Sequence, residues 1–428
     1  MTAAAAASLA VVGGGWAGLA AAVRATEAGH RVTLYEMARH WGGRARGVEV
    51  DGLALDNGQH ILIGAYTRTL DLMAALGVDA GAALHRQPLE LRYPDGRGLR
   101  MPAGPAWLGF GAAVLGCVGW GWRDRLAVLG AATNWALRGF TCPTDLNVET
   151  LCQELPPAVR SLLIDPLCVA ALNTPARDAS AAVFLRVLRD AIFGGRGSAD
   201  LLLPRRDLGE LLPRPAAAWL ASRGAVLRPA HRVGQLERSG RGWAVDGEHF
   251  DTVLLACSAQ EAARLAQPHA TAWSEITLAV PYEPIITVYL HCAGARLPTA
   301  MVALSEGPEA PAQFAFDRGA IGGPAGVFAF VVSGARAWVE RGLSATGQAV
   351  LLQAQRAFAP GTWPTRPTVL RVMAEKRATF SCRPNLKRPA ALVAHNLAAA
   401  GDYVEGPYPA TLEGAVRSAD TALAALRG

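Results

Sequence analysis

The chain has 428 residues, of which 51% are hydrophobic and 18% charged, and it carries a formal net charge of +6. This composition excludes a disordered protein and allows two or three domains with a large core. None of the seven cysteines forms a C-x-x-C pair, so we expect no metal site and no disulfide framework, and we expect a reducing cytoplasm.

The first residues predict a strand–turn–helix–strand unit. The apolar runs 9–12 and 31–35 are typical of buried parallel strands, and the alanine-rich segment between them is typical of a helix. We interpret the apolar start as the first of these strands and not as a signal peptide, because no basic region precedes it. The turn contains G-x-G-x-x-G, with its glycines at Gly13, Gly15 and Gly18.

An acidic residue, Glu36, follows the second run. In this order the motif predicts a dinucleotide site. Its glycines let the backbone approach a pyrophosphate, the helix N-terminus faces the phosphates, and the acid accepts hydrogen bonds from the ribose hydroxyls.

The residues after the acid indicate which dinucleotide binds. Gly42, Gly43 and Arg44 follow Glu36 at a distance of about seven residues. A glycine pair and an arginine at this spacing resemble the flavoprotein family of amine oxidases and phytoene desaturases, in which the segment lies along the FAD pyrophosphate. The resemblance therefore implies FAD as the cofactor.

The same resemblance implies an α/β fold, in which a Rossmann-type FAD-binding domain is interrupted by an α+β substrate domain. We expect the FAD-binding domain to comprise residues 1–80, 196–265 and 376–428. We expect the substrate domain to comprise 81–195, which faces the membrane, and 266–375.

The stretch from Asp56 to His60 predicts a turn after a hairpin. In the family a similar stretch passes beside the flavin ring. This implies that Asn57 and Gly58 contact the cofactor and that Gln59 and His60 face the ring or the substrate. The alternative is an ordinary turn stabilised by Asp and Asn side chains.

A helix is predicted over 67–80 and a strand pair over 89–101. From Ala106 to Trp122 the chain then carries no charge for 17 residues. This run is short for a bilayer span and is interrupted by glycines, and its tryptophans lie near the ends. It predicts a monotopic surface patch or the mouth of an apolar tunnel; a buried helical hairpin is the alternative.

Two strands, 224–229 and 231–236, and a buried strand within 250–258 resemble the second FAD-contact region of the family. The resemblance implies that Val233 meets the adenine through its backbone and that Ala256 lies near the cofactor. Further strands are predicted at 285–290, 326–333 and 368–374, and a helix at 346–358. The glycine-rich stretch 319–326 follows no clear strand, so we predict no second dinucleotide site.

Near the C-terminus, a strand ends in Gly401-Asp402 and a helix is predicted to start near Ala410. In the family this Asp binds the ribityl and pyrophosphate region, and the helix N-terminus faces the flavin C2 carbonyl, where its dipole stabilises negative charge. Thr411 stands where amine oxidases often carry an aromatic residue, which counts against amine chemistry.

The cofactor contacts implied by the resemblance are therefore Gly13, Gly14, Gly15, Trp16, Ala17, Gly18, Glu36, Met37, Gly42, Gly43, Arg44, Asn57, Gly58, Val233, Ala256, Gly401, Asp402, Thr411 and Leu412.

The phrases L-D-N-G-Q-H-I-L-I-G and Y-P-A-T-L-E-G-A-V-R-S look most like the squalene-associated branch of the family. This implies reductive dehydroxylation of an apolar C30 isoprenoid alcohol in hopanoid precursor synthesis, with hydride from reduced FAD. An acid must protonate the allylic hydroxyl. The candidate catalytic residues are His60 as the acid, Gln59 as its orienter, and Tyr403 or Glu413 as other proton donors.

The expected partners are the isoprenoid substrate, upstream squalene-pathway enzymes and the inner face of the cytoplasmic membrane, with the protein peripheral to it. No basic block with interleaved aromatic residues indicates nucleic acid. Two alternatives remain: a carotenoid-type FAD-dependent desaturase, and a non-catalytic prenyl-lipid carrier that resembles Rab escort proteins.

Overall fold

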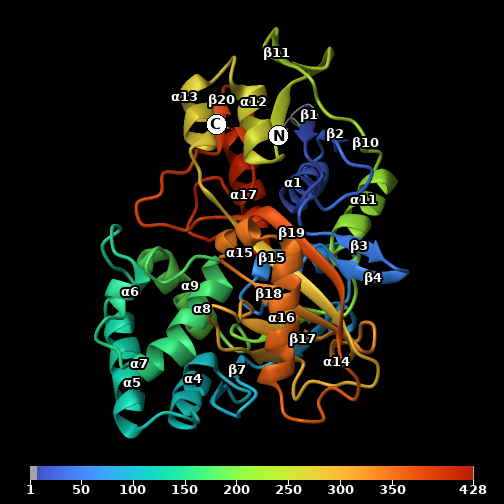
Figure 1. The fold of residues 1–428 in the computed structure, drawn as a ribbon. Coiled ribbons are helices and arrows are strands. Elements are labelled where there is room, and N and C mark those ends of the chain that lie inside the picture. Colours follow the sequence, from blue (N-terminus) through green and yellow to red (C-terminus); the bar gives the residue numbers. More distant parts are fainter. Residues whose placement is uncertain (1–6, 428) are drawn as a thin grey trace.

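The computed structural model describes residues 7–427, so the first six residues of the predicted apolar start lie outside it. A six-stranded sheet occupies one end of the molecule (Figure 1). Five strands are parallel and the edge strand β20 is antiparallel. The strands, in spatial order, are β10 (Val226–Arg228), β2 (Arg31–Tyr35), β1 (Ser8–Val12), β14 (Thr252–Leu255), β21 (Leu397–Ala399) and β20 (Leu392–Ala394).

Alternate residues of β1 face opposite sides of this sheet, as the strand period requires. Leu9 and Val11 pack toward three helices, α1 (Trp16–Glu27), α11 (Pro213–Ser222) and α17 (Leu412–Ala425). Ala10 and Val12 pack toward the other side. That side is covered by β11 (Leu236–Ser239), β12 (Gly242–Val245), β13 (Glu248–Phe250) and α12 (Ala259–Ala266), which is followed by α13 (Thr271–Leu278).

A second, antiparallel sheet of five strands forms the middle of the molecule. Alternate residues of its strand β18 again divide between two cores, because Phe328 and Phe330 face two helices and Ala329 and Val331 face the opposite side. The strands, in spatial order, are β16 (Met301–Ala303), β17 (Phe314–Asp317), β18 (Val327–Val332), β15 (Tyr282–His291) and β19 (Thr368–Phe380), and the helices are α15 (Arg336–Arg341) and α16 (Leu343–Ala357).

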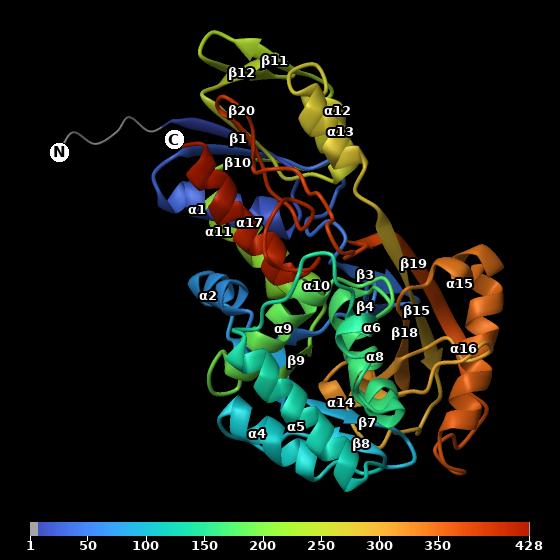
Figure 2. The same cartoon turned by 90° about the vertical axis from the view of Figure 1, so that its left-hand side faces the viewer.

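A cluster of helices packs on the other side of this second sheet (Figure 2). Its α4 and α5 lie at the end of the molecule away from the six-stranded sheet in both views. The cluster contains α4 (Ala106–Leu115), α5 (Trp122–Leu137), α6 (Val148–Leu151), α7 (Pro157–Val159), a π-helical turn (Arg160–Ile164), α8 (Asp165–Leu172) and α9 (Ala181–Phe193).

Short elements connect these units. They are the hairpins β3 (Gly47–Val50)–β4 (Leu53–Asp56) and β7 (Glu90–Arg92)–β8 (Gly98–Arg100), the sheet β5 (Leu62–Ile63), β9 (Leu201–Pro204), β6 (Leu84–Gln87), and the helices α2 (Thr67–Ala75), α3 (Ala80–Ala83), α10 (Leu208–Leu211) and α14 (Arg318–Ile321).

The predicted α/β fold is confirmed, with two local corrections. The helix predicted over 67–80 ends at Ala75, because Gly77 adopts φ +78, and a separate short helix starts at Ala80. The strand predicted over 231–236 is wrong. The Asp246 carboxylate accepts hydrogen bonds from the N–H groups of Gly234 and Gln235, which removes these groups from any strand pairing. The domain boundaries themselves stay a prediction.

Candidate functional site

The turn after β1 accepts only glycine at two positions. Gly13 adopts φ +116, and a Cβ added there would lie 2.5 Å from the Ala256 carbonyl oxygen. A Cβ on Gly18 would lie 1.8 Å from the Gly13 carbonyl oxygen. At Gly15, by contrast, the nearest atom to an added Cβ would be the Gly43 Cα at 4.0 Å. The free N–H groups of the first turn of α1 therefore adjoin open space, which suits an anion.

Glu36 is held in place at the end of β2. Its two carboxylate oxygens accept hydrogen bonds from the Gly14 N–H at 2.7 Å and the Ala38 N–H at 2.8 Å. Each oxygen keeps a further lone pair, so the carboxylate can still accept ribose hydroxyls. Met37, the next residue, is exposed.

The Gly42–Gly43 turn packs directly on the first glycine turn. The Gly42 N–H donates to the Gly14 carbonyl at 2.8 Å, and a Cβ on Gly43 would lie 3.3 Å from the Gly15 Cα. The buried Trp16 Nε1 donates to the Ala45 carbonyl at 2.8 Å, while its neighbour Ala17 is buried in the core. The two glycine turns therefore meet backbone to backbone at Gly15 and Gly43, while the Trp41 ring packs against Gly14.

Arg44 joins this turn to the C-terminal part of the chain. Its Nη2 lies 2.5 Å from the Asp402 Oδ1, although the two residues are 358 positions apart. Nη1 donates to the carbonyls of Arg377 and Ala378. Burial disfavours the charged guanidinium, but the Asp402 carboxylate outweighs it and holds the pKa of Arg44 above its usual range. Asn57 adds a hydrogen bond from Nδ2 to the Arg44 carbonyl.

The segment before α17 supplies the remaining predicted C-terminal contacts. The Gly401 N–H donates to Ser418 Oγ at 2.8 Å, and Thr411 is the N-cap of α17, its Oγ1 accepting the Gly414 N–H at 3.0 Å. The helix thus begins at Leu412, two residues later than Ala410. Tyr403 Oη is buried without a hydrogen-bond partner in residues 7–427.

Val233 lies on the side of β1 opposite α1. Ala256 lies beneath the glycine turn, next to Gly13 and Gly18. The Val233 carbonyl accepts Arg264 Nη2 at 2.7 Å, so this carbonyl is already engaged. Ala256 is buried, and its N–H donates to the Val12 carbonyl at 2.7 Å. Ala256 therefore supports the turn from below.

His60 and Gln59 follow β4. His60 Nδ1 lies 2.9 Å from the Gly58 carbonyl, and because a carbonyl only accepts, Nδ1 carries the hydrogen and Nε2 is left with a lone pair. Burial lowers the pKa of His60; the Gly58 carbonyl opposes this and the charge of Arg44 adds to it. A neutral His60 offers an acceptor at Nε2 and no acidic proton there. Gln59 Nε2 donates to the His60 carbonyl at 3.0 Å.

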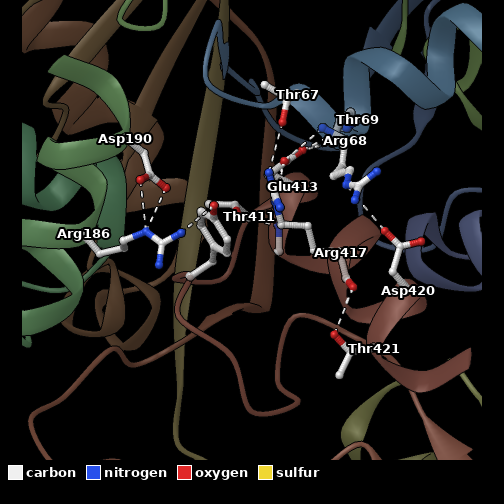
Figure 3. A network of polar contacts seen from close by, with 12 residues as sticks. Thr67, Arg68, Thr69, Arg186, Asp190, Thr411, Glu413, Arg417, Asp420 and Thr421 are labelled. Atoms are coloured by element: carbon white, nitrogen blue, oxygen red, sulfur yellow. Dashed lines mark hydrogen bonds and ion pairs between the residues drawn. The ribbon is translucent and has the colours of Figure 1, made fainter. Parts of the chain in front are cut away.

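Glu413, a predicted proton donor, lies in a structural network (Figure 3). Its Oε2 accepts the Thr69 N–H and hydroxyl at 2.9 and 2.7 Å, and its Oε1 accepts the Arg68 N–H at 3.1 Å. Oε1 also pairs with Arg417 at 2.7 Å. The side chain is fully buried. This arrangement caps the N-terminus of α2 and ties it to α17.

Tyr408 completes the contact between α17 and the helical cluster. Arg186 of α9 pairs with Asp190 at 2.9 Å and donates to Tyr408 Oη at 3.1 Å. Its guanidinium lies 4.9 Å from the Tyr408 ring centre, and that of Arg417 lies 5.2 Å from it. The aromatic ring therefore lies between two cations, one from each unit.

The assembled residues fit a flavin dinucleotide on three observations. A Cβ added at Gly15 would have no atom nearer than 4.0 Å, so a pyrophosphate has room beside this residue. Glu36 presents carboxylate lone pairs at the end of β2. Tyr403 Oη is a buried polar atom that the described part of the chain leaves without a partner, and burial raises its pKa well above the ordinary value, so it stays a donor. The helix dipole of α17 adds positive potential.

Two buried charged residues escaped the sequence analysis. Asp56 and Arg318 are 1% and 2% exposed, and Arg318 Nη1 donates to Gln59 Oε1 at 3.2 Å. Asp56 is the first residue of the predicted turn 56–60. Arg318 directly precedes the glycine-rich stretch 319–326, for which we predict no second dinucleotide site. A charged residue directly after an apolar strand was the available signal in both cases.

Comparison with known proteins supports the same assignment. The sequence profile described as "Flavin containing amine oxidoreductase" matches residues 16–426. The chain is 29% identical to the hydroxysqualene dehydroxylase of Rhodopseudomonas palustris, over 97% of this chain and 98% of that protein. It is 40% identical to the zeta-carotene desaturase of Synechocystis, over only 16% of this chain and 14% of that protein. An oxidoreductase from Methanosarcina mazei has a similar fold, with a TM-score of 0.73, 15% identity and coverage of 97% and 100%.

Proposed function

Because the chain belongs to the flavin-containing amine oxidoreductase family, it is an FAD-dependent oxidoreductase, and we propose that it removes the hydroxyl group of hydroxysqualene to give squalene. The observation that carries this proposal is the similarity to hydroxysqualene dehydroxylases over nearly the whole of both chains. We place the reaction in hopanoid precursor synthesis. The reduced flavin supplies the hydride, and the protein supplies positioning, a proton and a dry site.

In this proposal the two facing glycine turns hold the pyrophosphate, and Glu36 binds the adenosine ribose. Arg44 and Asp402 fix the ribityl side, and the N-terminus of α17 stabilises negative charge on the flavin. His60 Nε2 accepts the hydrogen of the substrate hydroxyl and so orients its oxygen. Tyr403 Oη is a donor toward the cofactor. Glu413 has no part in proton transfer, since its oxygens are occupied in the α2–α17 junction.

The test is anaerobic. The purified protein is examined for absorbance near 450 nm, about where oxidised flavins in general absorb. It is then reduced with dithionite and mixed with hydroxysqualene. Reoxidation of the flavin with formation of squalene is the expected result. A flavin that stays reduced here, but whose oxidised form is reduced by a polyene precursor, identifies the alternative, a carotenoid-type desaturase. A colourless protein that binds the lipid without turnover identifies a carrier.

We further propose that the α4–α5 surface binds the inner face of the cytoplasmic membrane. Within residues 7–427, no helix is both long and apolar enough to cross a bilayer. One side of α4 packs into the core through Gly109, Ala113 and Val114. Large apolar side chains on the opposite side of α4, in the connection to α5 and on α5 itself are 51% to 83% exposed. They are Trp107, Leu108, Leu115, Val118, Trp122, Leu126 and Leu137.

Two further features support a bilayer as the partner of this surface. Arg123 and Arg138 are exposed beside it, which suits anionic lipid. A cavity of about 370 Å³ lies among the helices behind it, lined almost wholly by apolar side chains such as Phe110, Trp135 and Phe193. An apolar substrate leaving the bilayer would meet an apolar space.

Replacing Trp107, Trp122 and Leu126 together by glutamate should reduce co-sedimentation with phosphatidylglycerol-containing vesicles at least about tenfold, because three side chains lose their apolar contact with lipid. The melting temperature should stay unchanged, since all three are exposed. Leu278→Glu, at an equally exposed site on α13, is the control and should bind vesicles like the wild type. Unchanged vesicle binding by the triple variant would show that another surface faces the membrane.

A further inference from the structure

Arg318, the first residue of α14, is a buried cation whose guanidinium donates only to neutral acceptors within the described residues. It is 2% exposed. Its Nη1 donates to two neutral acceptors, Gln59 Oε1 and the Pro204 carbonyl, each at 3.2 Å. In residues 7–427 its guanidinium forms no ion pair. A guanidinium has five N–H donors and its burial is costly when it is unpaired, so an oxygen-bearing ligand would stabilise it.

Asp56, at the end of β4, is the complementary group. It is 1% exposed, and its Oδ1 accepts the Leu208 N–H at 2.7 Å. Its Oδ2 is buried without a hydrogen-bond partner in the described chain. Burial raises the pKa of Asp56 to about 7, and the charge of Arg318 is the foremost influence opposing that rise. Asp56 therefore exists partly as a neutral acid at neutral pH.

Gln59 connects these groups to the turn that the family places beside the flavin. Its Oε1 accepts Arg318, and its Nε2 donates to the carbonyl of His60. Its own N–H lies 3.4 Å from Thr287 Oγ1 of β15. A buried carboxyl and a fixed amide from the end of β4 are thus brought together with a buried cation from α14, 259 residues away from Gln59 in the chain.

We propose that Arg318, Asp56 and Gln59 form a subsite for the oxygen atom of an allylic alcohol. The subsite binds the substrate hydroxyl and receives it as water. This inference rests on the proposed dehydroxylation and specifies where the leaving oxygen is bound. Arg318 donates hydrogen bonds to the oxygen as negative charge develops on it, which is the most effective use of a preorganised cation.

The C–O bond breaks and its electron pair stays on oxygen. Asp56 gives its proton to that oxygen, and water forms. The carbon accepts a hydride, which brings two electrons, from the reduced flavin. A proton from solvent would restore the acid, so that an alcohol, a proton and anionic reduced FAD would yield a hydrocarbon, water and FAD.

The experiment is a binding comparison in detergent micelles with the oxidised holoprotein. Hydroxysqualene and squalene are titrated separately, and their dissociation constants are obtained from the perturbation of flavin absorbance. The wild type should prefer the alcohol. Arg318→Met should lose about 10-fold or more of that preference, because a charged hydrogen bond is removed. Arg371→Met is the matched control: Arg371 lies on β19 of the same antiparallel sheet and is exposed, and its variant should keep the wild-type ratio.

The ratio of the two dissociation constants does not change when part of the protein sample is unfolded. If Arg318→Met weakens both ligands equally, the residue is structural and the subsite is refuted. If the wild type binds both ligands equally, the subsite is refuted, whereas reduced holoprotein that forms no squalene in the anaerobic test would refute the dehydroxylation itself. Should Arg318→Met not fold, Arg318→Lys replaces it, and the alcohol preference of this charge-keeping variant should fall between the values of the wild type and Asp56→Asn.

The pH profile gives a second readout. The groups facing Asp56 are Arg318 of α14, Asp207 before α10 and Tyr289 of β15. Because the acid form donates the proton, turnover should fall as pH rises through about 7. Asp56→Asn keeps an acceptor for the Leu208 N–H but cannot titrate, so its residual turnover should lack this fall. A fall that persists in Asp56→Asn would exclude Asp56 as the acid.

Discussion

Gly15→Ala should give a protein that folds but purifies with less than about a tenth of the normal FAD, because the added methyl group enters the space into which a pyrophosphate must come. In the protein itself the nearest atom to this methyl would be 4.0 Å away. The backbone at Gly15, with φ −75, is open to any residue. The free energy of unfolding of the apoprotein should therefore fall by no more than about 1 kcal/mol, the cost of a poorer N-cap.

The measurement is the ratio of flavin absorbance to protein absorbance, with the melting temperature of both apoproteins alongside. Gly130→Ala, within α5 and with no atom within 4 Å of the added Cβ, is the matched control and should keep its FAD. Gly18→Ala should instead fail to fold, because its Cβ would lie 1.8 Å from a backbone oxygen. A Gly15→Ala protein with a full complement of FAD would contradict the assignment of the first glycine turn to the pyrophosphate.

Glu413→Ala should lower the free energy of unfolding by about 3–5 kcal/mol, mainly because the buried Thr69 N–H and hydroxyl are left without an acceptor. Arg417 loses its partner, and the Thr69 N–H and hydroxyl and the Arg68 N–H lose their acceptor. The measurement is urea unfolding of the apoprotein.

Glu405→Ala is the control for this loss, since Glu405 is exposed in the loop before α17 and its removal should change stability by less than about 0.5 kcal/mol. The two roles considered for Glu413 predict opposite results. A Glu413→Ala protein that is as stable as the wild type, binds FAD and has lost turnover would restore Glu413 as a proton donor.

Local sequence was sufficient for the parts of the fold whose cause is local. The continuous apolar run of β1 predicts a buried strand, and the glycines at positions 13 and 18 predict a tight turn; both lie where expected. The strand predicted over 231–236 failed for a non-local reason. Only Val233 and Leu236 of this segment are apolar, and the Asp246 side chain accepts the N–H groups of Gly234 and Gln235 that a strand would use.

The same limit applies to the site. Arg44 could be picked out by its spacing from Glu36, yet its partner Asp402 is 358 residues away. The structural use of Glu413 depends on Thr69, 344 residues away, and no periodicity near either residue indicates that contact. Arg318 and Gln59 are likewise 259 residues apart. Buried polar pairs of this kind become visible only when the chain is folded.

The six-stranded sheet has a consequence for the order of folding. Its strands come from residues 8–35, 226–255 and 392–399, so the sheet is complete only after residue 399 has left the ribosome. Contacts this distant in sequence form slowly, and a nascent chain must keep its apolar N-terminal strands protected meanwhile. Capture of the coenzyme is then a late event in biogenesis, and chains that lack the last thirty or so residues should be colourless even when the middle of the molecule has folded.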